Sequence, residues 1–207
     1  MRARFTPVAL ACLGLVVMLG SLRASGYPVP SPVVDRWEFD FQPGYLRLAT
    51  LPTGPNGEME AYWYFTFTVT NNGSMDREYA PSFVMYDSEG ELRASGAPPK
   101  ATKAILELLD NPLIEDEISI GGTLRVGKAN ARSGVVIWPV ESAAVDQVII
   151  FVGNISGETA VETDPLTGEK VVLRKTLALT YDTPGDVLPL LRQGGLPEPS
   201  DSLWIMR

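Results

Sequence analysis

Carboxylates are the main side chains with reactive potential in this 207-residue chain, which contains 25 Asp and Glu residues. The sequence has no histidine and a single cysteine, Cys12, which lies in the apolar N-terminal run. It therefore lacks an imidazole general base, a Ser-His or Cys-His nucleophile pair and a His-ligated metal centre. No Ser is followed three residues later by Lys, the spacing typical of a Ser-Lys nucleophile. If the protein is an enzyme, its reaction must therefore depend on carboxylates; otherwise it has no catalytic activity.

One group of carboxylates is dense enough to suggest a calcium site. Glu115, Asp116 and Glu117 are adjacent, and Asp110 lies shortly before them. Calcium prefers oxygen ligands, so these four side chains are the candidate metal ligands. Their spacing matches no EF-hand loop, so a solvated acidic loop that follows a helix is the favoured interpretation, and no metal is predicted.

The second group of candidate residues is aromatic. Tyr62 and Tyr64 occupy alternate positions of a predicted strand, on the face opposite the core, and Tyr86 lies in a later strand. Such a surface suits stacking on a sugar ring or contact with a partner protein. The favoured interpretation is nevertheless that a helix or the tail covers this face. Trp204, in an apolar C-terminal run, is the fourth candidate; docking of that run on the domain itself is the favoured interpretation.

These candidates favour a binding protein over an enzyme. A glycosidase uses two carboxylates that flank the scissile bond, and nothing in the sequence singles out one pair among 25 acidic residues. We therefore predict a non-catalytic protein without a cofactor, which binds or scaffolds a protein or glycan whose identity the sequence does not give. The alternative is a carbohydrate-active enzyme or carbohydrate-binding module that uses carboxylates and surface tyrosines.

The elements that must position these residues are mostly strands. Between Ala61 and Asn71, aromatic and β-branched residues alternate in a way typical of a long strand with one face in the core. Asn71-Asn72-Gly73 ends this strand with residues that tolerate positive φ. Alternation and turn signals predict the other strands at 37–41, 45–49, 82–87, 91–94, 133–139, 146–154 and 171–181.

A short helix interrupts this series of strands. Ile105, Leu108 and Leu109 recur at helical spacing within 100–110, and Asn111-Pro112 follows as a stop signal. Seven or more short strands with one short helical insertion predict an all-β fold, an antiparallel β-sandwich. Its expected core consists of Trp63, Phe65, Phe67, Phe83, Val135, Ile137, Ile149, Phe151, Leu177 and Leu179.

The stretch Phe65-Thr66-Phe67-Thr68-Val69-Thr70-Asn71-Asn72-Gly73 resembles the strand-and-turn signature of bacterial immunoglobulin-like and fibronectin type III-like domains. In those domains a long strand ends in paired polar residues and a glycine. The resemblance implies an immunoglobulin-like β-sandwich in an extracytoplasmic setting, and it implies no particular activity. The cysteine pair of antibody domains is absent from this sequence.

The N-terminal segment is typical of a secretory signal. A basic head with Arg2 and Arg4, an apolar run from Val8 to Leu19 and small residues after it predict a cleaved signal peptide and a secreted or periplasmic protein. An uncleaved membrane anchor is the alternative. The expected segments are a signal peptide at 1–26, a proline-rich spacer at 27–36, the sandwich domain at 37–184 and a tail at 185–207.

The charge of the chain excludes one class of partner. The formal net charge is −8, and loss of residues 1–26 leaves 14 basic against 25 acidic residues, a net charge of −11. Phosphate backbones and anionic lipid surfaces repel such a chain, because affinity for both comes largely from clustered Lys and Arg. Nucleic acid is therefore not an expected partner, and a membrane is expected only if the N-terminal segment stays uncleaved.

Overall fold

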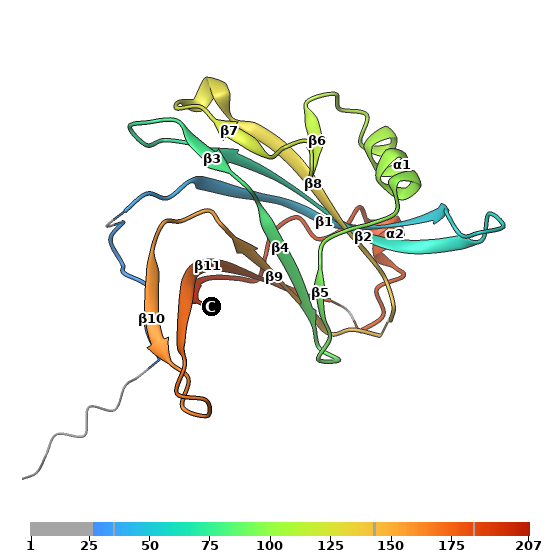
Figure 1. The fold of residues 1–207 in the computed structure, drawn as a ribbon. Helices are drawn as coiled ribbons and strands as arrows, with labels where there is room; N and C mark the ends of the chain where they lie inside the picture. The colour runs from blue at the N-terminus through green and yellow to red at the C-terminus, as the bar shows by residue number, and fades with distance from the viewer. Residues whose placement is uncertain (1–26, 35, 143, 184) are drawn as a thin grey trace, which may run out of the picture.

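Two β-sheets packed face to face form most of the structure (Figure 1). The structure is a computed structural model that describes residues 27–34, 36–142, 144–183 and 185–207. The strand order in the first sheet is β1 (Asp40–Pro52), β2 (Met59–Thr70), β8 (Arg132–Pro139) and β6 (Ile114–Asp116). The order in the second is β10 (Thr159–Thr163), β11 (Lys170–Asp182), β9 (Gln147–Gly153), β4 (Ser82–Asp87) and β5 (Leu92–Ala94), with β12 (Asp201–Met206) also paired to β11. A small third sheet joins β3 (Arg77–Tyr79) to β7 (Gly122–Leu124).

The prediction of an all-β sandwich is confirmed, and the predicted helix is present as α1 (Pro99–Leu109). The last helical residue is Leu109, and the C-cap residue Asp110 adopts a left-handed φ of 46°, before the Asn111-Pro112 stop signal is reached. A 3-10 turn, η1 (Lys128–Asn130), and a one-turn helix, α2 (Leu190–Gln193), were not expected from the sequence. The strand pairs are antiparallel except β6 and β8, which run parallel.

A continuous apolar core fills the space between the two sheets. Trp63, Phe65 and Phe67 face inward from β2, as their alternation predicts. Phe83 of β4 crosses from the second sheet, and its ring centroid lies 4.8 Å from that of Phe67. Six of the expected core residues lie in this cluster: Trp63, Phe65, Phe67, Phe83, Leu177 and Leu179.

Four expected core residues lie elsewhere, which corrects the prediction. Val135 and Ile137 are buried on the outer face of β8, beneath α1. Ile149 and Phe151 are half-buried on the outer side of β9. Each strand contains an unbroken apolar run, Val135 to Trp138 in β8 and Val148 to Val152 in β9, so alternation does not indicate which face is the inner one. The inward-facing residues are Val136, Trp138, Val148, Ile150 and Val152.

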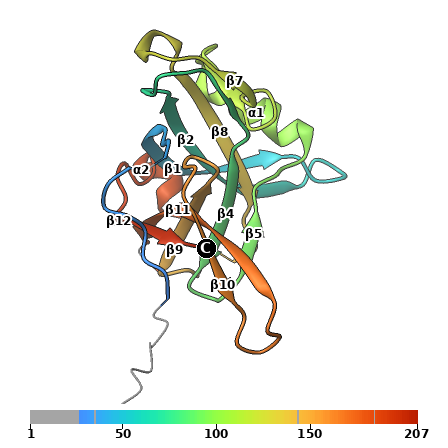
Figure 2. The same ribbon diagram turned by 60° about the vertical axis from the view of Figure 1, so that its left-hand side comes forward.

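The C-terminal tail docks on the domain's own second sheet, which confirms the favoured interpretation. β12 pairs with β11 from Lys175↔Met206 to Thr180↔Asp201 (Figure 2). Met206 is buried, and the half-buried Trp204 ring lies 4.8 Å from the Lys175 ammonium. The tail also touches the first sheet, because Leu196 exchanges backbone hydrogen bonds with Leu46 of β1.

The segment before β1 is tied to the same region. Residues 27–34 and Arg36 form no helix or strand. The Tyr27 hydroxyl donates a hydrogen bond to the Met206 carbonyl, and the Ser31 amide donates to the Glu158 carboxylate at 2.7 Å. The predicted signal peptide lies outside the described residues. Within the described ranges, no helix is long and apolar enough to cross a membrane.

Deletion of residues 198–207 is expected to lower the free energy of unfolding by about 1–3 kcal/mol, the range for burial of one or two large apolar side chains. The deletion removes Met206 and Trp204, while the lost ladder hydrogen bonds are largely offset by regained chain entropy. Equilibrium urea unfolding measures the difference. The matched control is Leu203→Ser, whose side chain is 58% exposed and which should change stability by less than about 0.5 kcal/mol. A deletion variant as stable as the parent would show that β12 adds nothing.

Candidate functional site

Helix α1 lies across the outer face of the first sheet (Figure 1). Its proline at position 99 occupies the first turn, where the missing amide costs no helical hydrogen bond. Ala101 and Ile105 are its buried residues. Together with the sheet residues beneath them they form a second apolar core, whose sheet members are Ala49, Tyr62, Tyr64, Val135 and Ile137. This second core fixes the helix on the sheet.

The tyrosine surface considered as a candidate site is not exposed. Tyr62 and Tyr64 are 2% and 6% exposed beneath α1, and burial raises the pKa of both phenols. The Tyr62 hydroxyl donates to the Glu60 carboxylate at 2.7 Å. Tyr86 is half-buried on β4 and Trp204 is half-buried on β12, so the four candidates share no surface. Coverage of Tyr62 and Tyr64 by a helix or the tail was the favoured interpretation, and α1 accounts for their burial.

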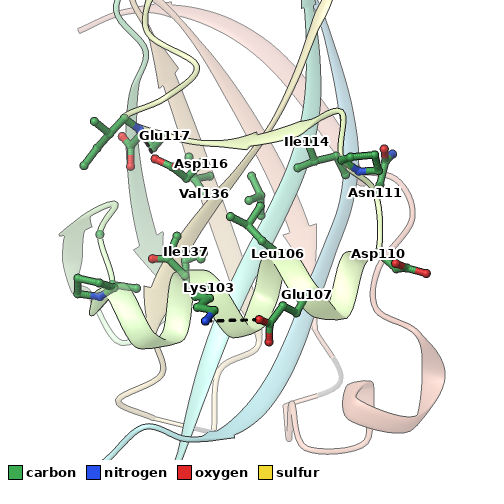
Figure 3. Close-up of a pocket in the computed structure, with 17 residues that line it drawn as sticks. Lys103, Leu106, Glu107, Asp110, Asn111, Ile114, Asp116, Glu117, Val136 and Ile137 are labelled. Carbon is green, nitrogen blue, oxygen red and sulfur yellow. Dashed lines mark hydrogen bonds and ion pairs between the residues drawn. The ribbon is translucent and has the colours of Figure 1, made fainter.

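A groove of about 840 Å³ runs along α1 (Figure 3). One wall is the helix, the other is the chain that leads into and out of β6, and the floor is the outer face of β8. We name it the α1 groove. The residues that define it are Gly96, Ala97, Pro99, Thr102, Lys103, Leu106, Glu107, Asp110, Asn111, Pro112, Ile114, Asp116, Glu117, Ile118, Val135, Val136 and Ile137.

Three of the four candidate calcium ligands line this groove, yet the structure does not gather the four around a cation. Asp110, Asp116 and Glu117 are lining residues, whereas Glu115 is bound by Arg132 through two hydrogen bonds of 3.0 and 2.5 Å. Successive residues of β6 point to opposite sides, which separates Glu115 from its neighbours. Across the described residues, no three His, Cys, Asp or Glu side chains are arranged to hold a metal ion.

The two adjacent carboxylates of the groove have different environments. Burial raises the pKa of Glu117, and the negative charge of Asp116 adds to the rise. The Ser95 hydroxyl, which donates to Glu117 Oε1 at 2.5 Å, offsets this effect only in part. Burial acts in the same direction on Asp116, but hydrogen bonds from Ser119 and Ile118 outweigh it and lower the pKa of that carboxyl. Asp116 is therefore the more firmly ionised of the two.

Sequence reasoning missed the apolar half of this site. Leu106, Ile114 and Ile118 line the groove, although none of them was singled out. A signal was present, since Leu113 and Ile118 flank an acidic stretch and remain 76% and 90% exposed. Exposed apolar residues that form one patch with a polar rim are typical of a binding surface.

Comparisons with known proteins do not assign a function to the site. No protein-family model, curated protein or solved structure matches the chain. The features that bear on function are therefore the volume, the lining and the charge of the α1 groove.

Proposed function

We propose that this chain is a non-catalytic, exported binding protein whose ligand occupies the α1 groove. The observation that carries the proposal is the groove itself, because its volume of about 840 Å³ falls in the range of roughly 300–1,000 Å³ typical of small-molecule sites. The second apolar core holds both the helix and the floor, so the site is preformed. The proposed export rests on the signal-like pattern of residues 1–26.

The lining supports binding rather than catalysis. Asp116 and Glu117 have their pKa values shifted in opposite directions, a pattern that also occurs in acid-base pairs. However, Asp116 is engaged by its own loop: Oδ1 accepts the amides of Ile118 and Ser119, and Oδ2 accepts the Ser119 hydroxyl at 2.6 Å. A carboxylate used in this way stabilises the groove wall, which leaves no evident pair of reacting groups.

The lining also favours an apolar ligand over a sugar. Leu106, Ile114 and Ile118 present aliphatic surface above the buried Val135 and Ile137, and no aromatic ring is among the described residues that line the groove. Stacking on aromatic faces, the interaction expected for a carbohydrate module, is therefore not provided there. For this reason we place the apolar ligand ahead of the carbohydrate alternative.

The test is binding of Nile red, a neutral dye whose fluorescence rises in apolar surroundings. The parent protein should bind it, and Leu106→Glu should weaken binding about tenfold or more, because a charge then replaces apolar surface in the groove. The matched control is Leu108→Glu on the same helix. Leu108 is 58% exposed and lies outside the groove, so this variant should bind the dye like the parent.

A second variant guards against loss of folding, since Leu106 also packs against the second apolar core. Ile118→Glu adds a charge at the rim of the groove, where the side chain is 90% exposed and supports no core. It should weaken dye binding without changing the melting temperature. Unchanged affinity in both groove variants would show that the dye binds elsewhere and would overturn the proposal.

A further inference from the structure

The α1 groove carries an excess of negative charge. Glu107, Asp110, Asp116 and Glu117 line it, against the single cation Lys103. The Lys103 ammonium already lies 3.9 Å from the Glu107 carboxylate. Within the described part of the chain, the other three carboxylates have no ion-pair partner. A ligand that fills the groove therefore meets uncompensated negative charge.

Glu117 is the carboxylate most strongly affected by such a ligand. Its side chain is half-buried beside the aliphatic lining, where a charge interacts more strongly than it does in water. Oε1 accepts the Ser95 hydroxyl, while Oε2 accepts no hydrogen bond from the described residues. Glu117 thus offers one free acceptor at the edge of an apolar floor.

The end of the groove opposite Glu117 also favours a positively charged group. Helix α1 ends there at Asp110, with no basic residue in its last turn. Both the carboxylate and the negative end of the helix dipole favour a positive group at this position. Lys103 is the only cationic side chain among the described residues that line the groove.

We infer that the ligand of the α1 groove is a small amphiphilic amine, an apolar body that carries a protonated nitrogen. The body covers Leu106, Ile114 and Ile118, and the nitrogen donates a charge-assisted hydrogen bond to Glu117. This inference rests on the proposed function, because it specifies the ligand class for the same groove. A volume of about 840 Å³ suits a small molecule, and charge complementarity selects the amine.

The experiment compares three probes with the same apolar chain: octylamine, octanol and octanoate, each displacing Nile red from the full chain at neutral pH and low salt. Octylamine should displace the dye at about a tenfold lower concentration than octanol, and octanoate should be the weakest of the three. Added salt should reduce the advantage of the amine, because the carboxylates are partly open to solvent.

Two variants assign the preference to the groove. Glu117→Gln should reduce the advantage of octylamine to about twofold or less while octanol binding stays unchanged. Asp110→Asn, a change that suits the left-handed position of this residue, should reduce it more weakly. The matched control is Glu89→Gln in an exposed turn of the second sheet, which should leave all three affinities as in the parent.

The outcomes separate the two proposals. Displacement by all three probes with equal affinity, or a preference for octanoate, would overturn the amine inference and leave the apolar binding site intact. An amine preference that survives both groove variants would also overturn it. Absence of dye binding by the parent protein would instead overturn the proposed function, and the amine inference with it.

Discussion

Replacement of Lys175 by methionine is expected to lower the free energy of unfolding by about 3–5 kcal/mol. Lys175 lies on β11 and is 4% exposed, with its ammonium 2.9 Å from the Glu38 carboxylate and 3.3 Å from that of Glu158. Methionine fills a similar volume but leaves two largely buried carboxylates without their cation. Removal of one partner is the costly change for a buried ion pair, because the remaining charge is uncompensated. Equilibrium urea unfolding measures the loss.

Lys103→Met is the matched control for this substitution. The Lys103 side chain is 79% exposed and lies 3.9 Å from Glu107, so its removal should cost less than about 0.5 kcal/mol. In the Lys175→Met background, Glu158→Gln should restore part of the lost stability, because it removes one of the two unpaired charges. If Lys175→Met and Lys103→Met lost equal stability, the buried ion pairs of Lys175 would stabilise the fold no more than the exposed pair of Lys103 does.

The same ion pair gives a pH signature. Burial alone would lower the pKa of Lys175, but hydrogen bonds and charges from Glu38 and Glu158 outweigh it and raise that pKa. A raised pKa means that the folded state holds the proton more tightly than the unfolded state does. The added stability is therefore complete below the unfolded pKa of about 10.4 and is lost as the pH rises through the folded value. Above that pH the parent should lose more stability than Lys175→Met does.

Phe67→Ala is expected to lower the free energy of unfolding by about 3–5 kcal/mol, the cost of truncating a large buried aromatic side chain. The ring is 3% exposed and packs against Phe41, Phe65 and Phe83 across the two sheets. Its packing is tight, because a Cβ added to Gly134 on β8 would come within 2.6 Å of this ring. Urea unfolding again provides the measurement.

Thr68→Ala is the control on the opposite face of β2. Thr68 is half-buried and shares a 3.0 Å hydrogen bond with Ser133, so its truncation should cost about 1 kcal/mol. Equal costs for the two substitutions would contradict the assignment of the inner face of β2. The chain beyond residue 26 contains no cysteine, so a reducing agent should leave both unfolding curves unchanged.

The fold was predictable from sequence wherever the two faces of a strand carried different types of residue. The alternation in Trp63, Phe65 and Phe67 identified β2 and its inner face, because aromatic residues fill the core on that side. The same reasoning failed for β8, where Val135 and Ile137 face a second core that exists only because α1 covers the sheet. A pattern within one strand carries no information about what a distant helix covers.

The candidate site was predictable only in part, for a related reason. The acidic side chains of Asp110, Asp116 and Glu117 stand out in the sequence, and the structure places all three at one groove. Their common role depends on parallel pairing of β6 with β8, which brings the segment after α1 back across the sheet. Parallel pairing needs a long connection and leaves no local turn signal, so residue spacing does not disclose it.

The hydrogen bond from Tyr27 to Met206 joins positions that are 179 residues apart, which constrains the order of events during folding. β11 is synthesised before β12, and until residues 201–206 are free to pair, one of its edges stays open. Contacts between such distant positions form late and slow the folding of β-rich domains. A nascent chain therefore passes through a stage with an unpaired strand edge, the state in which β-proteins associate with one another.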